Sequence, residues 1–347
     1  MKYLKYLLIF IPISIVAVFM KVSDFWMFIL SCLSIIPLAG LMGECTETIS
    51  FYSGPKIGGF LNATFGNATE LIISFFALKQ GLFDVVKSSI AGSVIGNILL
   101  VVGASMFAGG LKYKTQKFNV KVVEVSSTML LFAVLGLCIP ALFTHSVSSE
   151  LLNTRYEGLS LFVAIVMIII YALNLIFSFS THKDIYTNHS AEAETTEWSL
   201  KKAIIILIVT TVLIAIESEF LVNGIESITD ILGWSEFFVG IILIPIIGNA
   251  AEHSTAIVMA LKDQMDVALE IAIGSSLQII LFVAPVLIFL SLFFTPMSII
   301  FNPFELIALI ASVLIANRVS HDGESNWLEG VQLLAVYLII AACFFIV

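Results

Sequence analysis

Long apolar segments separated by short polar ones run along the whole chain. A helix needs about 20 mostly apolar residues to cross a bilayer, and eleven segments come close to this length. The breaks between them are polar or rich in turn formers, as at Ser53–Lys56 and Ser320–Glu324. The pattern predicts eleven transmembrane helices, near residues 4–21, 25–51, 57–80, 84–110, 122–144, 156–181, 200–229, 235–261, 266–294, 303–319 and 327–346.

Composition supports a lipid environment. Of the 347 residues, 59% are hydrophobic and only 12% are charged, whereas a soluble domain carries about 25% charge. The start, Met1–Lys5 followed by an apolar run, resembles a signal peptide, but Phe19–Lys21 offers no small-residue cleavage site, so we expect a retained first span. We predict an all-α polytopic membrane protein.

Basic residues indicate how these spans are oriented. With eleven spans, 12 of the 16 lysines and arginines fall on the side that holds the N-terminus. Only Lys21, Lys79, Lys87 and Arg155 fall on the other side. Because basic residues mark the cytoplasmic side, we expect the protein in the cell membrane with a cytoplasmic N-terminus and an extracytoplasmic C-terminus.

An internal repeat divides the chain into two halves. Gly66-Asn67-Ala68-Thr69-Glu70 returns 182 residues later as Gly248-Asn249-Ala250-Ala251-Glu252, and residues 66–107 and 248–289 share 12 identities in 42 without a gap. Each copy holds five predicted spans, an odd number, so the second copy is inverted and equivalent residues converge near the midplane. We predict an N-terminal helix (1–24), a first repeat (25–181), an acidic cytoplasmic linker (182–199) and a second repeat (200–347).

Three further features change this picture little. The linker carries Glu192, Glu194 and Glu197 and is either a solvated connector or a low-affinity cation sensor. The four cysteines have no metal-ligand spacing and are interpreted as small buried apolar residues. A net charge of −9 argues against a nucleic acid partner. The sequence leaves open whether the protein forms a homo-oligomer.

The repeated motif places an amide and a carboxylate on one helical face in each copy, since Asn67 precedes Glu70 by three residues and Asn249 precedes Glu252 by three. Gly66, Gly248 and the nearby Pro245 weaken the helix there, and a broken helix frees backbone carbonyls toward a cavity. Carboxylate, amide and carbonyl oxygens together suit a hard cation such as Ca²⁺. We therefore predict Glu70, Glu252, Asn67 and Asn249 as the metal ligands.

Electrostatics suggests what exchanges with the cation. Two carboxylates held close together in an apolar medium cannot both stay ionised without a cation. The site then has two neutral states, with Glu70 and Glu252 holding either one Ca²⁺ or protons. A carrier with these two states exchanges Ca²⁺ for H⁺ by alternating access, and it needs no cofactor beyond the transported ions.

Other polar residues at membrane depth are candidates for the site's surroundings or the ion pathway. They lie on the fourth, eighth and ninth spans: Ser93, Asn97, His253, Ser275 and Gln278. The hydroxyls of the two serines could also serve only close helix packing, and His253 could be a proton relay or a plain hydrogen-bonding residue. Glutamates on the second and seventh spans are candidates for lining ion entry routes, namely Glu44, Glu47, Glu217, Glu219 and Glu226.

These motifs resemble those of the CAX-type Ca²⁺/H⁺ antiporters, within the cation/Ca²⁺ exchanger superfamily. The first motif is Gly58–Ile72, which reads GGFLNATFGNATELI; the second is formed by Gly248–His253 and Gly274–Ile279. The resemblance extends over nearly the whole chain and is to the compact bacterial members. It implies Ca²⁺/H⁺ antiport, Glu70 and Glu252 as the central residues, and an acidic segment between the halves.

Two alternatives stay open, and we predict that the protein is not an enzyme. A sodium-driven exchanger of the same superfamily would resemble a pattern with serine and proline around the acidic residue, which neither Glu70 nor Glu252 shows. A cation channel would use the same oxygens without needing two neutral states. An intramembrane metalloenzyme is disfavoured, because Glu252-His253 lacks the two-histidine spacing of a zinc protease.

Overall fold

A computed structural model describes residues 4–144, 149–182 and 198–346. The first half of the chain contains η1 (Leu4–Ile9), α1 (Phe10–Phe19), α2 (Asp24–Phe65), α3 (Ala68–Lys79), α4 (Phe83–Ile95), η2 (Gly96–Val101), α5 (Val102–Tyr113), β1 (Thr115–Lys117), α6 (Val120–Thr144), α7 (Ser149–Ile176) and η3 (Phe177–Thr181). The second half contains α9 (Leu200–Asn223), α10 (Ile225–Leu232), α11 (Glu236–Phe238), η4 (Val239–Leu243), α12 (Ile244–Gly248), α13 (Ala250–Leu261), α14 (Met265–Gln278), η5 (Ile279–Val283), α15 (Ala284–Ser291), α16 (Pro303–Val319), β2 (Glu324–Asn326) and α17 (Trp327–Ile346).

All eleven predicted spans are helical over most of their length. Within the described residues, seven helices are long and apolar enough to cross a membrane, and the bent pair Glu236–Gly248 and Ala250–Leu261 makes an eighth. The other three spans are the shorter helix Tyr6–Phe19, the segment shared by the end of α2 and α3, and α16. The prediction of an all-α polytopic membrane protein is confirmed. The acidic residues of the predicted linker lie outside the described residues.

One local feature matches a predicted break, and another departs from the prediction. Gly54 interrupts α2 with a φ of 80°, a left-handed conformation that glycine adopts without a steric penalty. The helix therefore kinks between the second and third predicted spans. At the end of the seventh span the prediction is less accurate, since α9 ends at Asn223 and α10 begins again at Ile225.

The outer surface of the bundle is apolar. Leu142, Phe162 and Leu338 on α6, α7 and α17 are 65%, 64% and 66% exposed, and contiguous exposure of such side chains is typical of a lipid-facing surface. The cysteines follow the same pattern: Cys45 and Cys138 are buried, but Cys32 is half-buried and Cys343 is exposed. The prediction that all four are buried is thus wrong, because a lipid-facing position also suits an apolar side chain.

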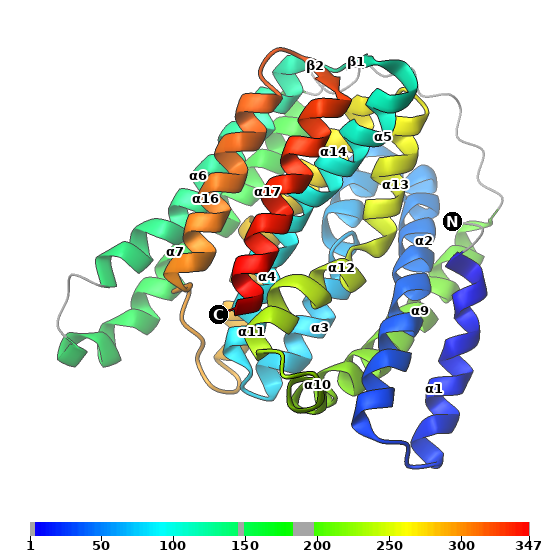
Figure 1. The fold of residues 1–347 in the computed structure, drawn as a ribbon, viewed down its shortest axis with the longest axis vertical. Helices are drawn as coiled ribbons and strands as arrows, with labels where there is room; N and C mark the ends of the chain where they lie inside the picture. The colour runs from blue at the N-terminus through cyan, green and yellow to red at the C-terminus, as the bar shows by residue number, and fades with distance from the viewer. Residues whose placement is uncertain (1–3, 145–148, 183–197, 347) are drawn as a thin grey trace.

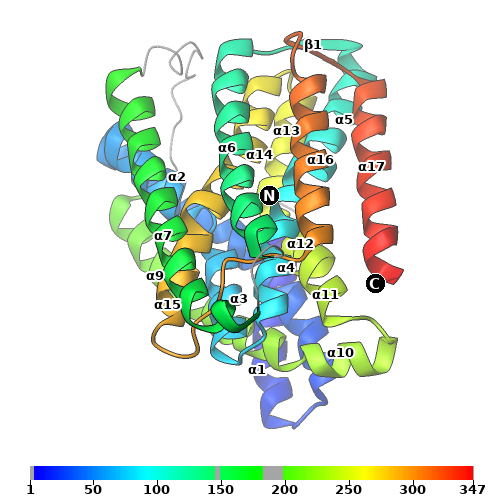
Figure 2. The same ribbon diagram turned by 90° about the vertical axis from the view of Figure 1, so that its left-hand side faces the viewer.

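The two repeats run in opposite directions. In Figures 1 and 2, β1 and β2 lie at one end of the bundle, which we call the β end, and α10 lies at the other, the α10 end. The helix α4–η2–α5 rises to the β end, where Tyr113 donates to the Leu261 carbonyl (3.0 Å). Its counterpart α14–η5–α15 starts near that end and descends to Phe294, which contacts Phe75 of α3. The repeat is therefore inverted, as predicted.

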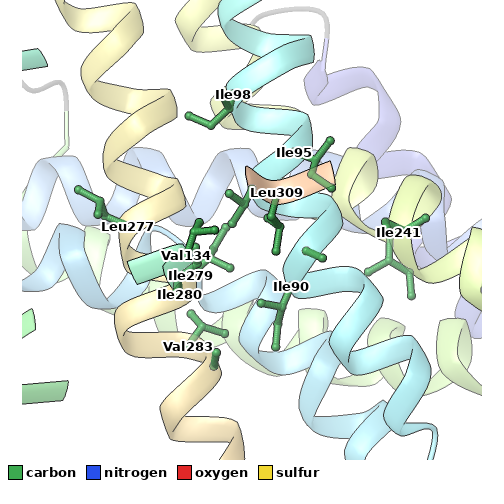
Figure 3. Packing of buried hydrophobic residues seen from close by; sticks show 14 of the residues in the cluster. Ile90, Ile95, Ile98, Val134, Ile241, Leu277, Ile279, Ile280, Val283 and Leu309 are labelled. Carbon is green, nitrogen blue, oxygen red and sulfur yellow. The ribbon is translucent and has the colours of Figure 1, made fainter. Parts of the chain in front are cut away.

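The centre of the bundle is a core of buried apolar side chains around α4 and α14. Figure 3 shows Ile90 and Ile95 of α4 in one cluster with Leu277 and Ile280 of the opposite repeat and with Leu309 of α16. Both central helices change to a π-helical turn at equivalent places, η2 and η5. Such turns occur often at functional sites, and here they lie one turn beyond the repeated Gly-Ser pairs.

Two glycines allow the backbones of α4 and η4 to pack directly against each other. A Cβ on Gly92 would lie 2.0 Å from the Ile241 carbonyl oxygen, and one on Gly240 would lie 2.0 Å from Ser88 Oγ. Close contact of this kind is how small residues pack helices in membranes. It fixes the helix that leads into Gly248 against the first repeat.

The substitution Gly92→Ala is therefore expected to destabilise the protein by about 1–3 kcal/mol, the usual cost of overpacking. Thermal unfolding in detergent measures this, with Gly96→Ala as the matched control on the same continuous helix. A Cβ at Gly96 meets no atom within 4 Å, so the control should keep the wild-type melting temperature. Equal melting temperatures for both variants would contradict the importance of this contact.

Candidate functional site

Each repeated motif lies at a break in its helix. In the first copy α2 ends at Phe65 and α3 starts at Ala68, while in the second α12 ends at Gly248 and α13 starts at Ala250 with a bend of 59°. Asn67 and Asn249 occupy the breaks with non-helical backbone angles, and neither side chain caps its own helix. Both amides are therefore directed to other partners. The broken helices expected from the glycines are confirmed.

The Glu70 carboxylate of the first copy packs against the break of the second. Its Oε1 lies only 2.8 Å from the position that a Cβ on Gly248 would occupy. Glu70 is 6% exposed, whereas Glu252 is half-buried. Glu252 lies in the first turn of α13, directly after that break. Glu70 therefore lies beside the second break, as expected from the inverted repeat.

Two hydrogen bonds around the breaks are related by the repeat. Ser275 Oγ donates to Asn67 Oδ1 at 2.8 Å, and Asn249 Nδ2 donates to Ser93 Oγ at 3.3 Å. Subtracting 182 from the numbers 275 and 249 gives 93 and 67, so the same pair of positions is joined twice. Each copy thus positions its asparagine with a serine from the other copy.

The remaining polar neighbours differ between the copies. Asn67 Nδ2 donates to Gln278 Oε1 at 2.7 Å, and His253 Nε2 lies 3.1 Å from Asn97 Oδ1. Asn249 Nδ2 also donates to the Pro245 carbonyl at 3.0 Å. The same carbonyl accepts the Asn249 backbone N–H at 3.0 Å, so the side chain and the backbone of Asn249 both bind to it.

Three oxygens of this group have no hydrogen-bond donor. Glu70 Oε2, Glu252 Oε2 and Asn249 Oδ1 are buried and unpartnered among the described residues. A buried acceptor without a donor is costly, and a carboxylate more so. A hard cation or a proton would satisfy these oxygens. No group of three or more His, Cys, Asp and Glu side chains that could hold a metal ion is found in the described part of the chain. The negative charge available here is that of Glu70 and Glu252.

Most of the predicted site residues lie together here. Hydrogen bonds join Asn67 with Ser275 and Gln278, Asn249 with Ser93, and His253 with Asn97. Glu70 contacts the second break, and Glu252 lies in the helical turn that follows it. Glu44 is half-buried on α2, which also contacts α13. Glu226 is exposed in the first turn of α10, at the α10 end. The sequence analysis did not predict that the Pro245 carbonyl accepts a hydrogen bond from Asn249. Its position just before the helix break was the one sequence feature that could have indicated this.

Comparison with known proteins agrees with this arrangement. Residues 23–180 and 202–346 match the family described as sodium/calcium exchanger protein. The chain belongs to this family. Among its exchanger relatives, the Ca(2+)/H(+) antiporter ChaA of Bacillus subtilis (strain 168) is 46% identical over 342 residues, with 97% of this chain and 96% of that protein covered. The Ca(2+)/H(+) antiporter of Aphanothece halophytica is 48% identical over 355 residues, covering 98% and 95%.

Solved exchanger structures show the same fold. The structure of native YfkE superposes with a TM-score of 0.87 at 43% identity, covering 99% of this chain and all (100%) of that one. The resemblance to Ca²⁺/H⁺ antiporters that the two motifs indicated is confirmed by these relatives.

Proposed function

We propose that this protein is a secondary transporter that exchanges Ca²⁺ for H⁺ across the membrane, with Glu70 and Glu252 as the shared binding residues. The curated relatives that are 46% and 48% identical carry this activity in their names. The single observation that carries the assignment of the residues is the set of unpartnered oxygens on Glu70, Glu252 and Asn249. They belong to two broken helices that face each other.

Charge explains why one site takes both ions. Two ionised carboxylates have a charge of −2, which one Ca²⁺ or two protons neutralise. An intermediate charge is costly in a medium of low dielectric. Alternating access would then operate between the two neutral forms. In these forms the charge of the carboxylates is neutralised, so the site can be closed to water on both sides of the membrane.

Asn67, Asn249 and Ser275 supply the neutral oxygens in this proposal. Ca²⁺ takes 6–8 oxygens with flexible geometry, as a general rule. Asn249 Oδ1 is unpartnered, and Asn67 is held in place by Ser275 and Gln278. Asn67, Asn97 and Asn249 are each 1% exposed, so they position the site from within the protein.

The distribution of basic residues gives the orientation that we propose. Six basic residues belong to the β end: Lys112, Lys114, Lys117, Lys121, Lys262 and Arg318. The positive-inside rule assigns this end to the cytoplasm. The C-terminus at the end of α17 would then be extracytoplasmic.

Reconstituted vesicles test the function. A pH gradient imposed on vesicles that contain the purified protein should drive Ca²⁺ uptake without Na⁺, and uptake should stop when an ionophore removes the gradient. Each Ca²⁺ taken up should be matched by proton movement in the opposite direction. Uptake that needs a Na⁺ gradient would favour a sodium-driven exchanger, and uptake indifferent to both gradients would favour a channel.

A neighbouring serine pair offers a finer test of the site. Ser275→Ala removes the donor to Asn67 and is expected to lower Ca²⁺ affinity about 10-fold, the effect of losing a group that orients a ligand. Ser276→Ala is the matched control, because the Ser276 hydroxyl bonds only to the Ala272 carbonyl of its own helix (2.8 Å). Ca²⁺ titration of transport by both variants measures the difference. Equal affinities would remove Ser275 from the site.

A further inference from the structure

A second group of buried oxygens lies between α1, α2 and α9, on other helices than the Glu70 and Glu252 pair. It contains the Glu217 carboxylate, 1% exposed, and three serine hydroxyls that are 0% exposed, those of Ser14, Ser31 and Ser34. The sequence made Glu217 a candidate for lining an ion entry route. In this structure Glu217 is buried against α1, and its role in an entry route stays a prediction.

Ser14 has two acceptors for one hydrogen. Its Oγ lies 2.8 Å from the Ile11 carbonyl oxygen and is also hydrogen-bonded to Glu217 Oε1. A serine hydroxyl has a single hydrogen to donate. When that hydrogen points to the Ile11 carbonyl, two oxygens face each other with nothing positive between them. A cation beside Glu217 Oε1, or a proton on it, would resolve the conflict.

The other oxygens of this group lack partners. Glu217 Oε2, Ser31 Oγ and Ser34 Oγ are buried without a hydrogen bond to any described residue, although both serines lie beside the carboxylate. Hydroxyls inside helices commonly bond to the carbonyl four residues earlier, as Thr46 and Ser312 do here. Ser31 and Ser34 make no such bond, and their hydroxyl oxygens lie beside the Glu217 carboxylate.

Charge and ligand type define what could bind. Glu217 forms no ion pair among the described residues, so the group has a charge of −1 when the carboxylate is ionised. One monovalent cation neutralises it, whereas a divalent cation would leave an excess positive charge in an apolar region. Hydroxyl and carboxylate oxygens are ligands for hard cations.

We propose that Glu217, Ser14, Ser31 and Ser34 form a second cation site that takes one small monovalent cation, Na⁺. The site is distinct from the exchange site and does not depend on the proposed function. It joins α1, which lies before the repeats, to α2 of the first repeat and α9 of the second. Bound Na⁺ therefore stabilises the packing of these three helices.

Thermal unfolding of the purified protein in detergent tests this proposal. The protein is kept at constant pH with Ca²⁺ chelated, and NaCl replaces choline chloride at constant ionic strength. The melting temperature should rise saturably with Na⁺, by about 2 °C or more when Na⁺ reaches ten times its dissociation constant. Glu217→Gln should abolish the rise.

Two further variants keep the test decisive. The double variant S31A/S34A retains Glu217 and should weaken Na⁺ binding at least about 10-fold, so it decides the outcome if Glu217→Gln does not fold. The double variant E70Q/E252Q should keep the full Na⁺ effect. An effect lost in E70Q/E252Q, one unchanged in S31A/S34A, or stabilisation by acid but not by Na⁺ would each overturn the proposal.

Discussion

Glu70→Gln and Glu252→Gln are each expected to reduce pH-driven Ca²⁺ uptake by more than about 100-fold. This loss is larger than the loss of about 10- to 100-fold that follows when a group that only orients a ligand is removed. Glutamine keeps the size of the side chain and one oxygen, but it can neither carry the negative charge nor release a proton. With one carboxylate left, a bound Ca²⁺ leaves a net positive charge in the bundle centre. Initial uptake rates in vesicles measure the loss.

The matched control is Glu124→Gln, the same chemical change on α6 at an exposed position outside the candidate site and pathway. This variant should transport at the wild-type rate, which shows that loss of a glutamate charge alone does not stop exchange. Equal amounts of folded protein must be reconstituted in every case. Robust uptake by either central variant would remove that glutamate from the mechanism.

Gly248→Ala is expected to lower the apparent Ca²⁺ affinity about 10- to 100-fold, the range seen when a ligand's support is disturbed. The new Cβ would lie 2.8 Å from Glu70 Oε1 and 3.2 Å from its Cδ. The atoms it meets are the end of a flexible side chain, so the carboxylate can move aside and the fold is retained. The Ca²⁺ dependence of transport measures the shift.

Gly274→Ala provides the comparison, because a Cβ there meets no atom within 4 Å. Its Ca²⁺ affinity should equal that of the wild type, and both variants should melt at similar temperatures. Wild-type affinity in Gly248→Ala would mean that the contact between Glu70 and the second break is not part of the Ca²⁺ site.

Much of this architecture could be predicted because the bilayer imposes strong rules on sequence. Span length, charge distribution and the repeat offset are all local or periodic features, and they led to eleven helical segments in two inverted copies. The convergence of Glu70 and Glu252 near the midplane then follows from symmetry. The hydrogen bonds of Ser93 and Ser275 to the two asparagines were not predicted.

Contacts between non-equivalent positions could not be predicted in this way. Gly92 and Gly96 look alike in the sequence, yet only Gly92 lies against the carbonyl of Ile241, and that depends on how α4 and η4 cross. Likewise, Ser14 lies outside the repeat, so no symmetry indicates that it meets Glu217 some 203 residues later. Such contacts are set by tertiary packing rather than by local pattern.

Proton release on Ca²⁺ binding tests the central claim most directly, that Ca²⁺ and protons compete for Glu70 and Glu252. Ca²⁺ is added to the purified protein in weakly buffered detergent solution, and a pH indicator follows the protons released. Where the free site is protonated, the wild type should release up to two protons for each Ca²⁺ bound, and release should end when binding saturates. Saturable Ca²⁺ binding with no release of protons across the pH range of transport would contradict the account.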